Sequence, residues 1–268
     1  MSINRNIFFA DISARLFDGQ LTRQQITGLD AILSHWEAWP QNEDLRHLAY
    51  MLATVHHETG GRFEQVREGF AKTDAEARRR VRKRPYGKPA PNGHVYYGRG
   101  FVQITWLENY KRVGDLIGVD LVDNPDLALN LYVATRILFE GMERGLFTGR
   151  RLDEYFNDTT DDPVGARAII NINDQAQLIA GYHKAFLAAL NAAQATSPQT
   201  SRISQLPINI PAVMSGGITA ASGVITALLA TLESPWALAG LAILVFSLAY
   251  QMSGRGRPRT GQRANAKR

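Results

Sequence analysis

The stretch that decides the fold is LRHLAYMLATVHHETGG, residues 45–61. Its apolar residues recur at the spacing of one helix face, which predicts a half-buried helix over residues 43–57. These residues are Leu45, Leu48, Ala49, Leu52 and Val55. Gly60 and Gly61 end the helix, since glycine adopts the left-handed backbone that stops a helix without strain. The helix therefore delivers the carboxylate of Glu58 at its C-terminal end.

The second informative stretch is YYGRGFVQIT, residues 96–105. Residues 95–104 read as a strand or extended run, bent by Gly98 and Gly100, that presents Gln103 and Thr105. Thr105 and Glu108 fit the spacing of a capping box, which predicts a helix from Thr105 to about residue 117.

The remaining pattern of residues 1–193 is mostly helical. Helices are predicted over 21–39 and 174–193, with shorter ones near 150–156 and 163–171. Asn124 and Pro125 read as the start of a helix that runs to Met142. Residues 74–84 are predicted as a charged helix or loop. A loop rich in Pro and Gly is predicted over residues 85–94. We expect a mainly α domain with a small β element.

Composition sets further limits. The chain has no cysteine, so disulfides and thiolate metal sites are excluded. The first residues lack an apolar run of signal-peptide length, and we expect no export by an N-terminal signal. The net charge of +5 belongs to the C-terminal part, because residues 1–193 sum to about −1 by subtraction.

Residues 194–268 differ in kind from the rest. A polar linker, 194–207, precedes a hydrophobic region over 208–252, and a basic tail follows over 253–268. The region divides at Glu233 into two charge-free stretches, 208–232 and 236–252, and the second has the length and apolarity of a membrane span. We expect a membrane hairpin with the lipid bilayer as partner; a single span, or a surface helix or spacer over 208–232, stays open.

Two carboxyl groups are the usual requirement for cutting a glycosidic bond. Glu58 is the candidate acid, because burial and the negative end of the helix dipole favour its protonated form. Glu68 is the candidate for the second group, and Glu64, Asp74 and Glu76 are its rivals. His56 and His57 lack the spacing of a zinc motif, so we expect neither a metal nor another cofactor.

The chain resembles the family 19 glycoside hydrolases through three motifs taken together: HHETGG, YYGRGFVQIT with the following NY pair, and GVDLVDNPDLAL. This family comprises chitinases and the related endolysins of bacteriophages, and the resemblance covers about residues 45–190. It implies a lysozyme-like, largely helical fold and an inverting reaction. It also implies roles for Glu58 as general acid, Glu68 as the second carboxylate, and Thr105 as the residue whose hydroxyl helps hold the attacking water.

The same resemblance implies a set of substrate contacts, although Ile172 stands where the family has a glycine. The implied contacts are Tyr96, Gln103, Asn109, Tyr110 and Asn171. From the residues alone, Thr105 also reads as a helix cap, and Tyr96, Tyr97 and Trp106 read equally well as core aromatics. An exposed aromatic ring in a groove would instead stack on sugar rings.

The run RRRVRKR, residues 78–84, reads either as a solvated face or as a surface that attracts anionic cell-wall polymers or lipid headgroups. It lacks interleaved aromatic residues, so we expect no nucleic-acid partner.

These observations predict a phage-type endolysin. It would cut the β-1,4 glycan strands of peptidoglycan and be anchored in the host inner membrane. A chitinase is the alternative, as is a membrane- or virion-associated structural or holin-like protein that keeps the hydrolase fold. Oligomeric state stays open.

Overall fold

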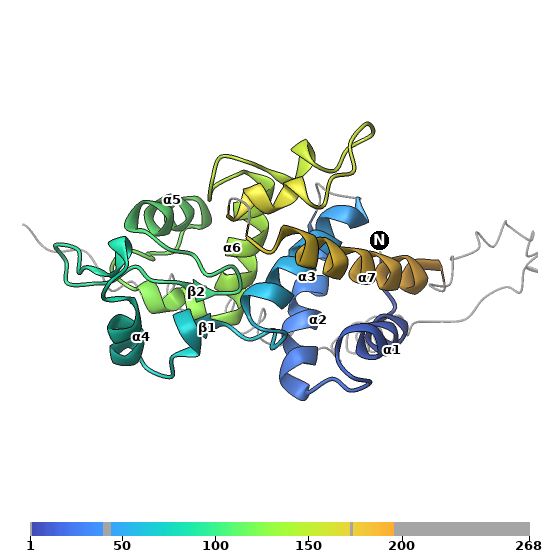
Figure 1. Ribbon diagram of the computed structural model, residues 1–268, viewed down its shortest axis with the longest axis horizontal. Coiled ribbons are helices and arrows are strands. Elements are labelled where there is room, and N and C mark those ends of the chain that lie inside the picture. The colour runs from blue at the N-terminus through green and yellow to red at the C-terminus, as the bar shows by residue number, and fades with distance from the viewer. Residues whose placement is uncertain (1, 40–43, 172–173, 196–268) are drawn as a thin grey trace, which may run out of the picture. The chain divides into compact units, whose positions relative to one another are not determined.

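The computed structural model describes residues 2–39, 44–171 and 174–195, and this part of the chain is mainly helical with one small sheet (Figure 1). The α-helices are α1 Arg5–Leu16, α2 Arg23–Ala38, α3 Leu45–Glu58, α4 Asp74–Val81, α5 Leu107–Ile117, α6 Leu131–Glu143 and α7 Ala176–Ala195. The strands are β1 Val66–Arg67 and β2 Arg99–Gly100. The 3-10 helices are η1 Glu68–Phe70, η2 Pro85–Gly87, η3 Pro125–Leu129, η4 Leu152–Glu154 and η5 Gly165–Ile169. The predicted fold class, mainly α with a small β element, is confirmed.

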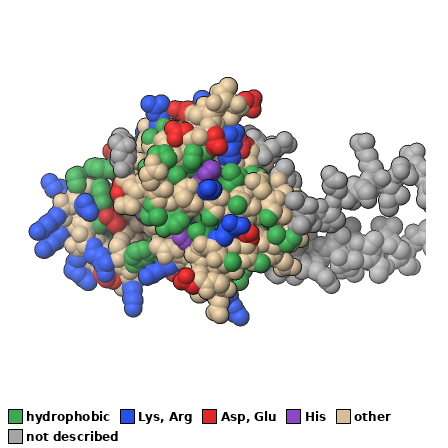
Figure 2. All heavy atoms as spheres, turned by 45° about the vertical axis from the view of Figure 1, so that its right-hand side comes forward, with side chains coloured by type: hydrophobic (Ala, Val, Ile, Leu, Met, Phe, Trp, Pro, Cys, Tyr) green, Lys and Arg blue, Asp and Glu red, His purple; other side chains and the backbone are tan. Residues whose placement is uncertain are grey.

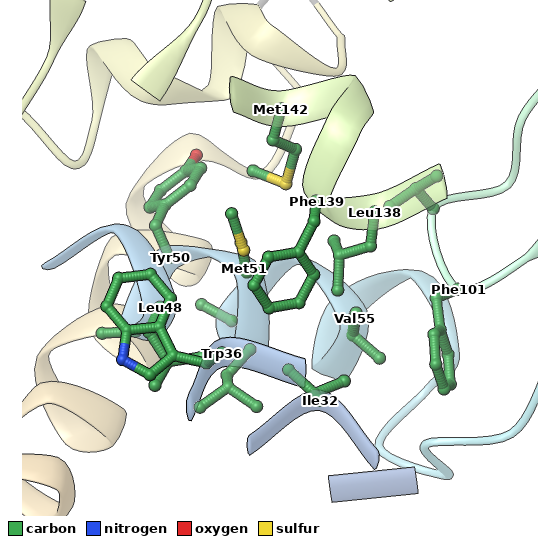
Figure 3. Close-up of a cluster of buried hydrophobic side chains, with 14 of the residues drawn as sticks. Ile32, Trp36, Leu48, Tyr50, Met51, Val55, Phe101, Leu138, Phe139 and Met142 are labelled. Atoms are coloured by element: carbon green, nitrogen blue, oxygen red, sulfur yellow. The ribbon is translucent and has the colours of Figure 1, made fainter. Parts of the chain in front are cut away.

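Helix α3 is the centre of the helical body, which we define as α1, α2, α3, α6 and α7. It contacts α7 along its length and also packs against α2 and α6 (Figure 1). Every residue from His47 to His56 is buried, so α3 is covered on all sides rather than on the one face predicted. The side chains of Met51 and Val55 meet Phe139 and Leu138 of α6 in the core shown in Figure 3.

Helix α1 was not predicted from the sequence. The Asn4 side chain accepts a hydrogen bond from the Ile7 amide at 3.3 Å and so caps it. Its buried residues, Phe8 and Ile12, lie on the side that packs against α7, where the rings of Phe8 and Phe186 stack at 6.5 Å. Burying one such ring contributes about 1.5–3 kcal/mol. Two buried residues per three turns give too weak a periodic pattern to mark the helix in advance.

The helix predicted from Asn124 to Met142 is divided in two. Asn124 and Pro125 begin the short η3, and the Asn124 side chain makes no capping hydrogen bond. Helix α6 starts afresh after Asn130, whose side chain accepts from the amides of Tyr132 and Val133 at 3.0 and 3.2 Å. The prediction of one helix capped by Asn124 was wrong because a second cap residue lies six positions further along.

A small lobe carries the sheet, and we define it as residues 66–100. Strands β1 and β2 pair antiparallel, with Val66 opposite Gly100 and Arg67 opposite Arg99. The extended run predicted over 95–104 thus contributes only two residues to a strand. The lobe has its own buried cluster, separate from the core of the helical body. Its members are Ala71, Ala77, Val81, Val95 and Tyr97.

None of the helices in the described part of the chain has both the length and the apolarity to cross a bilayer. Residues 194 and 195, predicted as the start of the linker, belong to α7. The rest of the predicted linker, the membrane segments 208–232 and 236–252, and the basic tail lie outside the described residues.

Candidate active site

Glu58 is the last residue of α3, where the sequence placed it. The chain turns sharply after it, because Gly60 and Gly61 adopt φ of 59° and 73° and the Gly61 amide donates back to the His56 carbonyl at 2.7 Å. Thr59 fixes this turn from inside: its buried hydroxyl donates to the Val55 carbonyl at 2.7 Å and accepts from the Phe63 amide at 3.0 Å. The backbone on both sides of Glu58 is therefore held rigidly.

The carboxylate of Glu58 is paired with Arg167, a residue that sequence reasoning missed. Arg167 Nη1 lies 2.9 Å from Glu58 Oε1, and the two side chains are only 4% and 16% exposed. Arg167 Nε also donates to the Asp174 carbonyl at 2.9 Å, so one guanidinium joins the end of α3 to the segment before α7. The signal was present in the sequence, since Arg167 is the one charged residue between Asp162 and Asp174.

Glu68 lies in the small lobe, at the start of η1. Its carboxylate accepts from the Tyr86 hydroxyl at 2.7 Å and from the Gly98 amide at 2.9 Å. A Cβ on Gly98 would lie 3.3 Å from Glu68 Oε2 and 2.8 Å from Gln103 Oε1, so a side chain there would crowd both. The glycine that the sequence suggested as a bend is thus what lets the carboxylate reach the backbone.

Gln103 is turned into the sheet. Its side-chain amide donates to the carbonyls of Val66 and Gly100 at 3.0 and 3.1 Å, which ties β1 to β2. Its backbone has φ of 51°, an uncommon value for a residue with a side chain, and Trp106 follows with φ of 72°. Such strained backbone gathers at functional sites, and here two examples flank Thr105.

Thr105 does not cap the next helix, so that prediction was wrong. Helix α5 begins at Leu107 with Trp106 in the cap position and no side-chain capping bond. The Asn109 side chain donates to the Thr105 carbonyl at 3.0 Å, which fixes Thr105 from below. The hydroxyl of Thr105 therefore does not have to divide its hydrogen bonds between capping and holding a water molecule.

The predicted substrate contacts Tyr96 and Tyr110 are core residues, 3% and 0% exposed. The Tyr96 hydroxyl donates to the Val122 carbonyl at 2.8 Å, and that of Tyr110 donates to the Tyr97 carbonyl at 2.8 Å. Neither ring offers a face to a sugar, which corrects the expectation for both. Trp106, in the same stretch of sequence, is 44% exposed, and its ring meets the Tyr86 ring edge-on at 5.4 Å.

A buried arginine, Arg99, holds this region together. Its guanidinium lies 3.6 Å from the centre of the Tyr97 ring and donates to Asp126 at 2.8 Å and to Asp74 at 3.3 Å. Arg67 donates to the other Asp126 oxygen at 2.6 Å. The small lobe is thus tied to η3 by charged groups, and the role of Arg99 was not predicted from the sequence.

The rival carboxylates Asp74 and Glu76 accept hydrogen bonds from charged or backbone donors of their own. Asp74 also accepts from Arg78 and the Tyr97 hydroxyl, and Glu76 accepts from Arg80 and the Lys72 amide. Glu64 lines a separate pocket of about 190 Å³ beside α2. Glu68 differs from Asp74 and Glu76 in that its donors, the Tyr86 hydroxyl and the Gly98 amide, are uncharged. It stays the candidate for the second carboxylate.

Asn171 is exposed, and its backbone amide donates to the Arg167 carbonyl at 3.0 Å. Asn171 thus lies four residues after Arg167, the arginine that holds Glu58. Ile172, the departure from the family pattern, lies outside the described residues.

The two histidines before Glu58 have separate environments. His56 is packed between Phe17, Phe63, Tyr182 and Phe186, and burial, with a smaller contribution from His57, lowers its pKa to about 4. His57 lines a pocket of about 580 Å³ together with Gln20, Gln25 and Tyr182. The sequence had left open which one packs inside.

The described residues thus present one carboxylate at the end of α3 and another on the small lobe. Residues 34–139 match the family model described as chitinase class I, the family 19 glycoside hydrolases. This part of the chain is therefore similar to glycoside hydrolase family 19, as the motifs indicated. Arg167 and Asn171 lie outside the matched range.

Relatives with curated names agree with this family. The chain is 34% identical to endochitinase A2 of Pisum sativum over 110 residues, covering 37% of this chain and 34% of that protein. It is 39% identical to a basic endochitinase of Vitis vinifera over 88 residues, covering 31% and 28%. A third match, 49% identical over 39 residues and covering 15% and 12%, is an inactive chitinase-like protein of Hevea brasiliensis. The chain thus spans about a third or less of the length of these relatives.

Among solved structures, chitinase C from Streptomyces griseus is 26% identical with a TM-score of 0.47, covering 68% of this chain and 76% of that one.

Proposed function

We propose that this chain is a glycoside hydrolase that cuts β-1,4-linked amino-sugar polymers by an inverting, two-carboxylate reaction. The observation that carries the proposal is the pair of held carboxylates: Glu58 on Arg167, and Glu68 on Tyr86 and the Gly98 amide. Each carboxylate is fixed by donors that leave it one defined orientation, which is what positioned acid and base groups require.

In the proposed reaction Glu58 protonates the glycosidic oxygen as the bond to the anomeric carbon breaks. Glu68 takes a proton from a water molecule whose oxygen attacks that carbon from the opposite face. The hydroxyl of Thr105 helps hold this water. Arg167 keeps Glu58 oriented and stabilises the carboxylate that remains once the proton has left.

We propose the glycan strand of bacterial peptidoglycan as the substrate, with chitin as the second candidate. Peptidoglycan is favoured by the sequence pattern of the C-terminal region, since a membrane-anchored enzyme lies beside the cell wall. Chitin is favoured by the relatives of this chain, which are named endochitinases. The match to an inactive relative is why a protein without activity stays the third possibility.

The test is hydrolysis by the full chain in non-ionic detergent, on purified peptidoglycan and on chitin in parallel. We expect release of new reducing ends from peptidoglycan and a loss of at least about a hundredfold in Glu58→Gln, since the amide cannot donate the proton. Faster cutting of chitin would instead favour the chitinase. Equal background rates for wild type and variant on both polymers would rule out the enzyme.

We also propose that residues 208–232 and 236–252 form a hairpin in the host inner membrane, with the hydrolase domain made on the cytoplasmic side. This rests on the sequence pattern alone. Single cysteines at Ser204, Ser234 and Gly261 would be labelled in intact cells with an impermeant reagent. Labelling of Ser234→Cys alone supports the hairpin, whereas labelling of Ser204→Cys without Ser234→Cys contradicts it.

A further inference from the structure

Helix α4 carries a surface that the proposed reaction does not use. Its apolar residues, Ala77 and Val81, are 0% and 1% exposed because they pack into the small lobe. The basic residues of the run 78–84 therefore project outward, on α4 and on the turn that follows it. Figure 2 shows Lys and Arg side chains gathered at the end of the molecule where Figure 1 places α4.

Two of these cations are neutralised within the helix. Arg78 pairs with Asp74 at 2.5 Å and Arg80 with Glu76 at 2.6 Å, each at i, i+4 spacing. Those two acids also accept from Arg99, the Tyr97 hydroxyl and the Lys72 amide, so their hydrogen-bonding capacity is already in use. They have little left to offer the other cations nearby.

Four exposed cations of the run remain, and we define them together with the exposed Lys88 as the basic patch. Its members are Arg79, Arg82, Lys83, Arg84 and Lys88. Within the part of the chain that the structure describes, no ion pair at 4.0 Å or less joins any of them to an acid. Residues 1–193 carry a net charge of only about −1 by subtraction, so this concentration of charge is local.

The basic patch adjoins the candidate active site. Arg84 stands two residues before Tyr86, and its charge acts on the Tyr86 hydroxyl. That hydroxyl donates to Glu68 at 2.7 Å, and the Tyr86 ring contacts the exposed ring of Trp106. A long polymer bound at Glu68 would therefore pass near the basic patch.

We propose that the basic patch binds a polyanionic polymer of the cell wall, one that carries phosphodiester or carboxylate groups along its length and is attached to the glycan substrate. Charge complementarity is the first reason, since several unpaired cations on one surface attract a flexible polyanion and raise its local concentration. A lipid surface fits less well, because interfacial binding needs an apolar face and that of α4 is buried.

The choice of a wall polymer rests on the proposed peptidoglycan substrate, but the binding itself does not require hydrolysis. The test compares three full-length proteins in non-ionic detergent: wild type, a patch variant and a matched control variant. The patch variant combines Arg79→Gln, Arg82→Gln and Lys83→Gln. The control, Arg23→Gln with Lys111→Gln and Lys184→Gln, removes the same charge from exposed positions on α2, α5 and α7. All three keep the basic tail, so its contribution cancels.

The probes are sacculi that carry poly(glycerol phosphate), the same sacculi stripped of that polymer, and vesicles rich in phosphatidylglycerol. At low salt we expect the patch variant to bind the polymer-bearing sacculi about tenfold more weakly than wild type and control, because three cations of the patch no longer attract the polyanion. The difference should vanish near 1 M salt, where the screening length is about 3 Å.

Equal binding of the patch variant and the control overturns the proposal. So does a patch-dependent difference on vesicles or on stripped sacculi that is as large as on the polymer-bearing sacculi. Cleavage of soluble neutral chitin oligosaccharides is measured alongside and should be unchanged in both variants. If wild type cuts nothing yet binds through the patch, the proposed hydrolysis fails and the basic patch stands.

Discussion

The contact between Glu58 and Arg167 supports the most direct prediction about this site. Replacing Arg167 by Met keeps most of the side-chain volume but removes the charge opposite a carboxylate that is only 16% exposed. It also leaves the Asp174 carbonyl without its donor at 2.9 Å. Removing one partner of a buried ion pair costs about 3–5 kcal/mol, and we expect Arg167→Met to lose stability in that range.

A double-mutant cycle isolates the contact itself. Arg167→Met, Glu58→Gln and the double variant are unfolded by urea in detergent and followed by circular dichroism. Hydrogen bonds to charged groups contribute about 1.5–3 kcal/mol, so we expect a coupling free energy of about 2 kcal/mol. Arg167→Lys should restore only part of it, because an ammonium group cannot form the two-armed bridge to Glu58 and Asp174.

The control is the pair Arg144 and Glu140 on α6, at 2.6 Å but with the arginine 50% exposed. Its coupling should stay below about 1 kcal/mol. If the Glu58–Arg167 coupling is no larger than that of the control, Arg167 does not hold the carboxylate, and its assigned role is wrong.

Two further predictions concern Thr105 and the buried histidines. Thr105→Ala should lower hydrolysis while changing the free energy of unfolding by less than about 0.5 kcal/mol. The control Asn130→Ala removes a side chain that does cap a helix and should cost about 1 kcal/mol. An equal loss of stability in both variants would mean that Thr105 caps α5 after all. Burial lowers the pKa of His56 and His183 to about 4, below the unfolded value of about 6.5, so their contribution is present above pH 6.5 and is lost as the pH falls towards 4. Burial lowers the pKa of His47 too, but the hydrogen bond and charge of Glu143 outweigh it and raise that pKa. The pH dependence of wild-type stability therefore combines opposite contributions from these histidines. His183→Phe should therefore be compared with wild type by urea unfolding at pH 5 and 7.5, and the loss of stability on acidification should shrink by up to about 2 kcal/mol; an unchanged loss contradicts the assignment.

The sequence was most informative where one local pattern decides the structure. The periodic run of α3 and the two glycines after it predicted both the helix and the position of Glu58, because helix periodicity and stop signals act over a few residues. The pattern failed for α6, since Asn124 followed by Pro125 and Asn130 are both good cap residues. Only packing decides which of them starts the longer helix.

The site was harder to predict wherever a side chain acts across the fold. Arg167 reaches Glu58 over a separation of 109 residues. Its position as a lone charge in its segment could have marked it, but no local pattern says which carboxylate it pairs with. Tyr96 and Tyr110 were misjudged for a related reason. A tyrosine in a polar motif looks available to a ligand until the fold supplies carbonyl partners for its hydroxyl, here those of Val122 and Tyr97.

The small lobe has a consequence for how damage to this protein would be noticed. Its buried cluster has only five apolar residues and is separate from the large core around α3, and the lobe holds Glu68. A thermal melt reports chiefly on the larger core, so a substitution such as Val81→Ala can loosen the lobe while the melting curve hardly moves. Loss of function without loss of apparent folding is therefore the expected phenotype of mutations in residues 66–100.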